Sequence, residues 1–277
     1  MSINISTNTA ALRAGSYLAQ NNAKLQTSFD RLASGKKLSS PIEDPGGLAV
    51  SMKLSASINR LAGAQNNVQN ATSFLEVQDG MLDTVGRIVD RMSELKGLAS
   101  QDPMKSSQDR ASYNNEFKDL QVQLYAISQQ GFNGVSLFAN HTTSANGDVT
   151  TTQTLFNGKD TLRARDNTLT IFTSTEGSGG AKVSVFKSSL LSALTIGEDK
   201  SINKEWSAAN NTTTATVATF ASASIEGTLD LDQISVGVIT QALENVSYLR
   251  SQNGGSQSRL AFNLESLTQQ KTNMRAA

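Results

Sequence analysis

Few residues in this chain could do acid–base, metal or nucleophilic chemistry, and they are scattered. The sequence has one histidine, His141, and no cysteine, which excludes disulfide bonds and thiol catalysis. No cysteine or carboxylate lies at metal-ligand spacing from His141. A Ser-His-Asp triad would have this single histidine to use and no supporting motif. The sequence therefore predicts no catalytic residue and no metal site.

Three short segments contain residue types that are common in binding sites. Glu43-Asp44 lies among turn residues before a predicted helix, where negative charge favours the helix N-terminus. The glycine-rich run 177–180 lacks the strand, lysine and helix that surround a phosphate-binding loop. Lys36 and Lys37 are too few for a nucleic-acid patch. We predict no cofactor, no nucleic-acid partner and no enzyme activity.

Composition points the same way. Lysine plus arginine and aspartate plus glutamate number 24 each, so the formal charge is zero and gives no reason to expect nucleic acid or an anionic membrane. The N-terminus lacks the basic stretch and apolar core of a secretory signal peptide. No run approaches the ~18 apolar residues that a membrane-spanning helix needs. We expect no membrane insertion, and either a cytosolic location or export by a non-classical route.

The strongest pattern is a seven-residue apolar repeat between Pro45 and about Ser100. Such a repeat keeps one seam of a helix facing a partner helix. At about 1.5 Å rise per residue the helix would be roughly 80 Å long, which indicates a rod with a structural or assembly role. The alternative is an amphipathic helix inside a large globular domain, but these rarely exceed about 25 residues without caps. The repeat consists of Leu54, Leu61, Val68, Leu75, Leu82 and Val89, and a companion seam of Ser57, Ala64, Ala71, Gln78, Val85 and Met92.

Helical periodicity also marks both ends of the chain. Residues 8–33 and 107–130 are predicted helices, and Ala11, Leu18, Leu25 and Leu32 are spaced by seven in the first of them. Heptads return from Leu231 to the end, with Ile239, Val246, Leu260 and Leu267 in one register and Asn253 as its polar exception. The helices of the two ends must therefore meet across the segment between them.

The middle of the chain has a different character. Helical periodicity disappears from about residue 140 to 228, and β-prone runs such as 169–172 and 182–186 replace it. We predict a mainly α fold, a long antiparallel coiled-coil-like helical bundle formed by both chain ends, with a central β-rich, solvent-facing variable insert. The expected domains are 1–44 as a coiled-coil segment and connector, 45–139 and 230–277 as the two parts of the rod, and 140–229 as the insert.

Several motifs, in order along the chain, resemble those of bacterial flagellins. Together they cover about residues 1–139 and 231–277 and leave out the insert, which is the variable part of that family. The matching residues are Asn8, Ala11, Leu12, Leu25, Arg31–Gly35, Asp44–Ala49, Phe132–Leu137, Leu249-Arg250, Gly254, Gln257, Arg259-Leu260 and Asn273–Ala277.

This resemblance implies a filament subunit that self-assembles for motility. In the family, the outermost terminal segments pair as a coiled coil lining a central channel, the long helices surround it, and the insert faces outward. The subunit is exported unfolded, without a cleaved signal peptide, to an extracellular filament. The resemblance also implies flagellar export chaperone and cap proteins as partners.

One departure from the family concerns the C-terminal end. Family members continue past the position of Asn273–Ala277, whereas this sequence stops there. We expect residues 1 to about 33 to lack an intramolecular partner for their apolar seam, and the chain to fold as bundle plus insert but polymerise poorly. A truncated chain and an unusually short family member both fit this expectation.

The resemblance also implies recognition by an innate immune receptor. In many flagellins an arginine and a leucine on the long helix and a glutamate on the third helix contact Toll-like receptor 5, and Arg91, Leu95 and Glu116 match these positions. Ser93 stands where strongly recognised members have a second arginine. The alternative is that Arg91 and Glu116 are solvated or paired across the bundle, which would be worth ~0.5 kcal/mol.

Two other functions remain open from sequence. The hook–filament junction protein shares similar termini, although segment 31–49 and the turn at 132–135 favour flagellin. The insert could instead be a binding module for carbohydrate or a host surface, with Trp206 among its Asn/Thr-rich loops.

Overall fold

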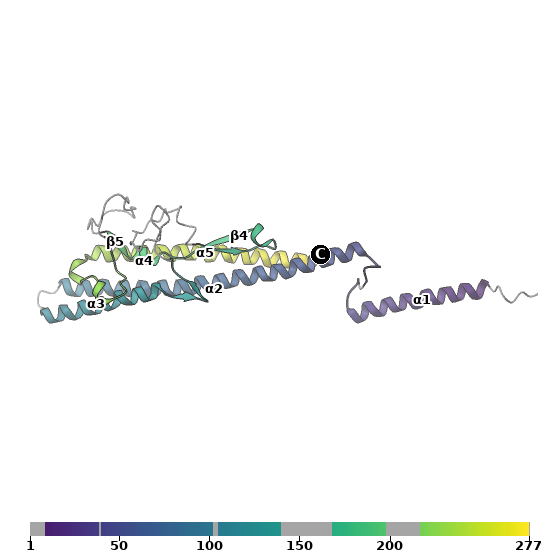
Figure 1. Cartoon of the computed structure of the whole chain (residues 1–277), viewed down its shortest axis with the longest axis horizontal. Coiled ribbons are helices and arrows are strands. Elements are labelled where there is room, and N and C mark those ends of the chain that lie inside the picture. Colours follow the sequence, from purple (N-terminus) through teal and green to yellow (C-terminus); the bar gives the residue numbers. More distant parts are fainter. Residues whose placement is uncertain (1–8, 39, 102–104, 140–167, 198–216, 277) are drawn as a thin grey trace, which may run out of the picture. The chain divides into compact units, whose positions relative to one another are not determined.

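The computed structural model describes residues 9–38, 40–101, 105–139, 168–197 and 217–276. It divides the chain into two units, residues 1–60 with 274–277, and residues 61–273. Long helices lie towards both ends of the chain and short strands between them (Figure 1), which confirms the mainly α prediction. His141 and Trp206 lie outside the described residues.

The first unit contains helix α1 (Thr9–Ser34) and a structured connector. Gly35 follows α1 with φ +65°, the left-handed conformation that commonly ends a helix. The connector is held by an ion pair between Arg31 and Glu43, 3.0 Å apart. Asp44 Oδ1 accepts the backbone N–H of Gly47 at 2.8 Å and so caps the next helix, which begins with proline.

Three long helices build the second unit. Helix α2 (Pro45–Gln101) has 57 residues and enters this unit at Leu61. Helix α3 (Ser107–Ser128) starts with a capping box between Ser106 and Asp109. Helix α5 (Val236–Ala276) lies alongside α2 (Figure 1), and the contacts at Gln65–Thr268 and Asp79–Arg250 make the two helices antiparallel.

Helix α5 begins later than its heptad pattern predicts, at Val236 instead of Leu231. Residues Leu231–Gln233 form a single 3-10 turn, η3. The backbone N–H of Leu231 donates to Asn114 Oδ1 at 2.8 Å, and its carbonyl accepts from Lys96 Nζ at 2.7 Å. These side chains occupy the main-chain groups that a helix would need, so the apolar repeat starts before the helix does.

The described strands form three antiparallel ribbons of two strands each. In the first, β1 (Gly131–Phe132) and β2 (Val135–Ser136) flank Asn133 and Gly134, whose positive φ values of 50° and 78° fit the predicted Asn-Gly hairpin turn. The second pairs β3 (Thr168–Phe172) with β4 (Lys182–Phe186), with the 3-10 turn η1 (Gly177–Gly179) between them. The third pairs β5 (Thr195–Gly197) with β6 (Val217–Thr219).

Part of the expected insert is buried and not solvent-facing. The short helix α4 (Leu190–Ala193) and the 3-10 turn η2 (Ile225–Gly227) contact α3. Leu190, Leu194 and Phe220 have relative exposures of 0%, 0% and 1%. These segments are too short to show a periodic pattern, so their place in the core could not be predicted from periodicity. The predicted domain boundaries themselves stay a prediction.

Truncating a seam residue should destabilise the second unit strongly. Leu75 is fully buried, so Leu75→Ala removes its packing and leaves a cavity, and we expect a loss of about 2–5 kcal/mol in the free energy of unfolding. The measurement is urea unfolding followed by circular dichroism. Leu18→Ala is the matched control, because Leu18 also belongs to a heptad seam but is 64% exposed. Equal losses for both variants would contradict this assignment of the core.

Candidate assembly interface

The predicted packing residues of the two long seams lie inside the second unit. The exception is Leu54, which is half-buried and belongs to the first unit, and the others are at most 3% exposed. The α2 and α5 seams meet, because Asn253 Nδ2 donates to the carbonyl of Leu75 at 2.9 Å. These side chains therefore pack within the chain's own bundle. The buried members are Leu61, Val68, Leu75, Leu82, Val89, Ile239, Val246, Leu260 and Leu267.

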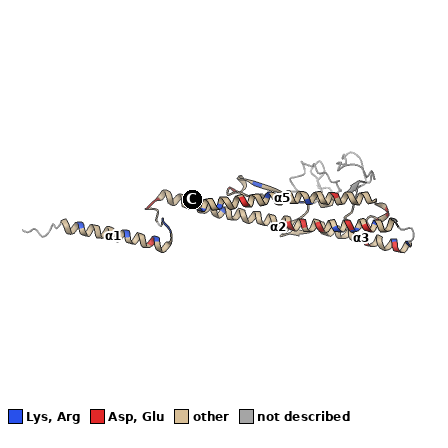
Figure 2. Cartoon of the chain, turned by 180° about the vertical axis from the view of Figure 1, so that it is seen from behind, with Lys and Arg blue, Asp and Glu red and all other residues tan. Residues whose placement is uncertain are grey.

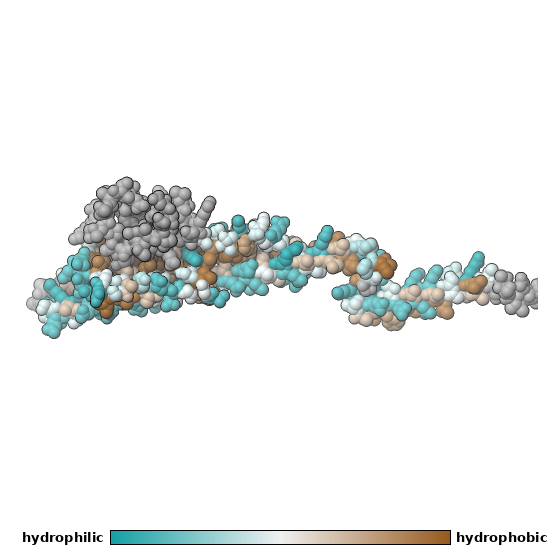
Figure 3. Space-filling view, viewed as in Figure 1, coloured by the Kyte–Doolittle hydropathy of each residue, from teal (hydrophilic) through white to brown (hydrophobic). Residues whose placement is uncertain are grey.

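The seam of α1 has the same spacing but a different environment. No residue of α1 is buried. Figure 3 shows apolar side chains in brown and tan on the surface of this helix. An apolar stripe of this kind is a surface that a partner helix can cover. The exposed large hydrophobic side chains of α1 are Leu12 (70%), Tyr17 (66%), Leu18 (64%), Leu25 (55%), Phe29 (65%) and Leu32 (82%).

The three residues expected to contact an immune receptor have contrasting environments. Arg91 Nε lies 2.8 Å from Glu116 Oε1, and its Nη1 lies 2.7 Å from Glu94 Oε2. The hydrogen bond to Glu116, followed by that to Glu94, raises the pKa of Arg91, so this guanidinium keeps its charge. Leu95 is 0% exposed. Of the three, only Arg91 and Glu116 offer side-chain atoms at the surface, and they are paired with each other.

Two further sets of ion pairs join helices or connect them to the returning chain. Arg250 on α5 contacts Asp79 at 3.1 Å and Asp83 at 2.8 Å, both on α2. Lys118 on α3 lies 2.7 Å from Asp230. Figure 2 shows that basic residues (blue) and acidic residues (red) are interspersed along these helices. All five side chains are a quarter or more exposed, so each pair adds at most about 1 kcal/mol.

Buried amide side chains hold the non-helical segments, and sequence reasoning missed them. Gln121 on α3 donates to the carbonyl of Leu229 at 2.8 Å and accepts its N–H at 2.9 Å, as a neighbouring strand would. Asn245 on α5 donates to the carbonyl of Ala193 at 2.9 Å. Gln78 on α2 donates to the carbonyl of Leu137 at 2.6 Å. The sequence feature that could have predicted such a contact is a polar residue at an apolar seam position, as at Gln78.

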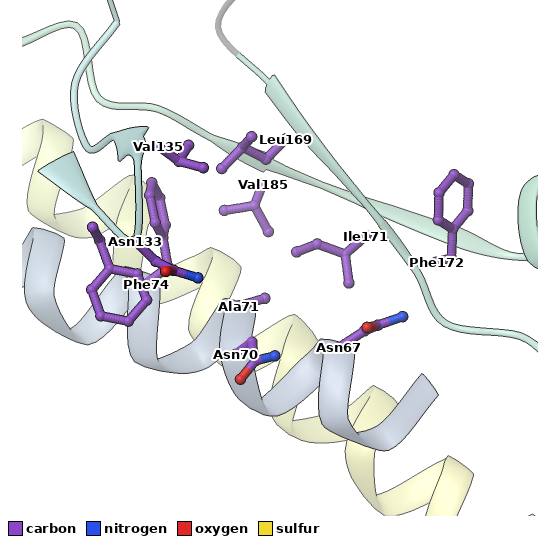
Figure 4. A pocket seen from close by; sticks show the side chains of 11 residues that line it. Asn67, Asn70, Ala71, Phe74, Asn133, Val135, Leu169, Ile171, Phe172 and Val185 are labelled. Atoms are coloured by element: carbon purple, nitrogen blue, oxygen red, sulfur yellow. The ribbon is translucent and has the colours of Figure 1, made fainter. Parts of the chain in front are cut away.

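An open groove of about 320 Å³ lies between α2, the β1–β2 turn and the β3–β4 ribbon. Figure 4 shows Asn67 and Asn70 at the α2 side, facing Leu169, Ile171 and Val185 of the ribbon. The lining is apolar with amides and contains no acid or base. None of its lining residues could act as a general acid or base.

Across the residues that the structure describes, no cluster of three or more histidine, cysteine, aspartate or glutamate side chains could hold a metal ion. None of the described helices combines the length and the hydropathy required to cross a bilayer.

Comparison with known families gives this helical arrangement an identity. Residues 5–143 match the model of the bacterial flagellin N-terminal helical region. The chain belongs to the bacterial flagellin family. As a flagellin it is a structural subunit of the bacterial flagellar filament.

Similarity to individual flagellins extends beyond the N-terminal region. The flagellin of Listeria innocua is 25% identical over 276 residues, which cover 99% of this chain and 83% of that protein. Flagellin A of Vibrio cholerae is 33% identical over 129 residues, 47% of this chain and 34% of its own. A 30.7 kDa flagellar filament core protein of Treponema maltophilum is 33% identical over 135 residues, 48% and 47% of the two chains.

The Lys118–Asp230 pair should make the free energy of unfolding depend on pH in the acidic range. The hydrogen bond from Lys118, with a second from Asn114, holds the pKa of Asp230 below its ordinary value of 3.8. A carboxyl whose pKa is lower in the folded state stabilises it above pH 3.8, and this contribution is lost as pH falls through the folded pKa.

We therefore expect Asp230→Asn to lower the urea midpoint at pH 7 and to reduce the difference between pH 7 and about pH 2. Asp232→Asn, two residues along and exposed, is the control and should leave that difference unchanged. An unchanged pH difference in Asp230→Asn would show that the pair does not stabilise the fold.

Proposed function

We propose that this flagellin assembles into the filament by burying the α1 seam against neighbouring helices, while the α2–α5 bundle serves as a preformed rod. The supporting observation is the contrast between the two seams. Leu61, Leu75 and Leu82 are completely buried within the chain, whereas Leu18, Leu25 and Leu32 of α1 are 55% or more exposed. Covering such a stripe removes apolar surface from water at about 25 cal/mol per Å², which favours association.

The start of α2 extends this proposed assembly surface within the first unit. Val50 is 56% exposed and Met52 is 66% exposed. Leu54 is half-buried, although it shares the heptad register of the buried α2 residues. We infer that these side chains also become covered in the assembled filament.

Assembly requires further partners. By family resemblance, the subunit is exported unfolded and without a cleaved signal peptide, is held by an export chaperone before secretion, and is added at the tip under cap proteins. The exposed α1 seam is a suitable chaperone-binding segment, because it would otherwise associate before export.

Filament growth on seeds tests the proposed assembly. We would add fluorescently labelled chain to preformed flagellar seeds, with and without an added C-terminal helix complementary to α1, and image them by electron and fluorescence microscopy. We expect labelled extensions from at least one version. The double change Leu18→Glu and Leu25→Glu should abolish them, because the introduced charges would have to be buried.

The control is Ser16→Glu with Gln20→Glu, which places the same charges at polar, exposed positions on the face of α1 opposite Leu18 and Leu25. It should grow normally. Growth restricted to the helix-extended version would support the expectation that α1 needs a C-terminal partner. Absence of growth from both versions, or equal growth of the two charge variants, would contradict the proposal.

We also propose recognition by Toll-like receptor 5 through Arg91 and Glu116. Both side chains are 42% exposed, and their pairing presents a fixed guanidinium on the α2–α3 surface. Buried Leu95 would act by supporting this surface and not by direct contact.

Reporter cells that express the receptor would test this. Arg91→Ala should reduce potency by roughly tenfold, the usual loss for a contact residue worth more than about 1 kcal/mol. Arg87→Ala, one turn away and 75% exposed, should have a smaller effect. Equal potency of wild type and Arg91→Ala would exclude this surface as the receptor contact.

A further inference from the structure

The heptad seams of α2 and α5 each contain one buried amide, and the two amides lie at the same level of the bundle. Gln78 interrupts the companion seam of α2, and Asn253 interrupts the seam of α5. Their relative exposures are 0% and 3%. Asn253 donates to the carbonyl of Leu75, one turn before Gln78 on α2. Arg250, one turn before Asn253, pairs with Asp79, the residue after Gln78.

The contacts of Gln78 also reach the segment that follows β2. Gln78 Nε2 donates to the carbonyl of Leu137, so one buried level connects α2, α5 and this segment. Phe74 on α2 packs edge-to-face against Phe132 of β1, with 6.3 Å between ring centroids. The polar layer, defined here as Gln78 and Asn253 with the carbonyls they bind, therefore joins elements that are distant in the sequence.

Burying these two amides does not maximise the stability of the bundle. Gln78 Oε1 is buried and has no hydrogen-bond partner among the described residues, which is unfavourable. Leucine at position 253 would continue the apolar seam. Polar residues at single seam positions of coiled coils set the register of the helices and lower their stability.

A purely apolar heptad seam does not determine the axial register of two helices, because the same apolar contacts form again after a slide of seven residues. Sliding α5 along α2 by one heptad would bring Val246 or Leu260 to the level of Leu75 and rebuild an apolar contact. Asn253 would then exchange the Leu75 carbonyl for that of Val68 or Leu82 and would be separated from Gln78, so that two levels of the apolar seam, instead of one, would each contain a buried amide. The exposed Arg250 pairs oppose the slide only weakly, since such pairs contribute little.

We propose that Asn253, supported by Gln78, determines the axial register of α5 on α2. The contacts of Lys96, Asn114 and Gln121 with residues 229–231 fix the point from which the chain enters α5. Asn253 fixes the level at which α5 then meets α2. This deepens the proposed function, on which it rests, because subunits that repeat in a filament need rods of one register.

Cysteine cross-linking can read this register directly, since the chain has no cysteine of its own. Gln65→Cys with Thr268→Cys reports the native register, because these side chains are 3.0 Å apart. Gln65→Cys with Ala261→Cys reports a slide of seven residues. Each pair would be oxidised in the wild-type background and in Asn253→Leu, and disulfide yields compared by mass spectrometry.

In the wild-type background we expect the native pair to exceed the shifted pair by roughly tenfold or more, because the slide would place buried amides at two levels of the apolar seam instead of one. In Asn253→Leu the shifted pair should rise to a yield comparable with the native pair, while the urea midpoint stays the same or increases. A variant that cross-links only in the native register would overturn the proposal, as would a large loss of stability without any change of register.

Gln121→Leu is the matched control. It removes a buried amide that holds Leu229 but lies outside the α2–α5 seam. It should lower the urea midpoint and leave the shifted cross-link as rare as in wild type. All these measurements use the monomer, so a failure of seeded filament growth would leave them interpretable, and a failure here would leave the filament function intact.

Discussion

The fold depends on one constraint, that helix α2 cannot bury its own apolar seam. Its buried heptad residues need a partner with a matching repeat, and α5 supplies it from the other end of the chain. Burial of these side chains provides most of the stabilisation, since a fully buried leucine is worth about 1.5–3 kcal/mol. The ion pairs around Arg250 and Arg91 are partly exposed and contribute far less each. The chain must therefore return across more than a hundred residues before its longest helix is stable.

The second requirement is that main-chain polar groups next to the seam find partners. The segments entering and leaving the bundle are not helical there, so their N–H and carbonyl groups need side-chain partners when they are buried. Gln121 satisfies both groups of Leu229, and Asn114 with Lys96 satisfies those of Leu231. This explains why a mainly α protein contains so many amides and why several are buried. It also explains why α5 starts only at Val236.

Seven-residue periodicity made the helices predictable from sequence. The packing of segments that lack a period was much harder to predict. The predicted helices at 8–33 and 45–100 differ from α1 and α2 by at most one residue at either end. The Asn133-Gly134 hairpin and the β3–β4 runs were also recognisable from local residue types. Burial of Leu190, Leu194 and Phe220 was not, because isolated apolar residues in short segments have no period. The amide contacts were equally hidden, since each joins residues far apart in the sequence. Leu95 illustrates another limit, because a family motif gives a position but not its exposure.

The contrast between α1 and α2 shows what a heptad repeat specifies. Leu18 and Leu82 occupy equivalent positions in seams of equal spacing, yet one is 64% exposed and the other 0%. A repeat states that a seam is to be buried and leaves open which helix will bury it. In α2 the polar exception Gln78, together with Asn253 of α5, marks the partner and its level. The described register of the α1 seam contains only apolar residues, Ala11, Leu18, Leu25 and Leu32, so the seam is selective mainly for the apolar repeat of a partner. Such a seam suits contacts formed between chains, where the geometry of the assembly sets the register that polar residues set within one chain.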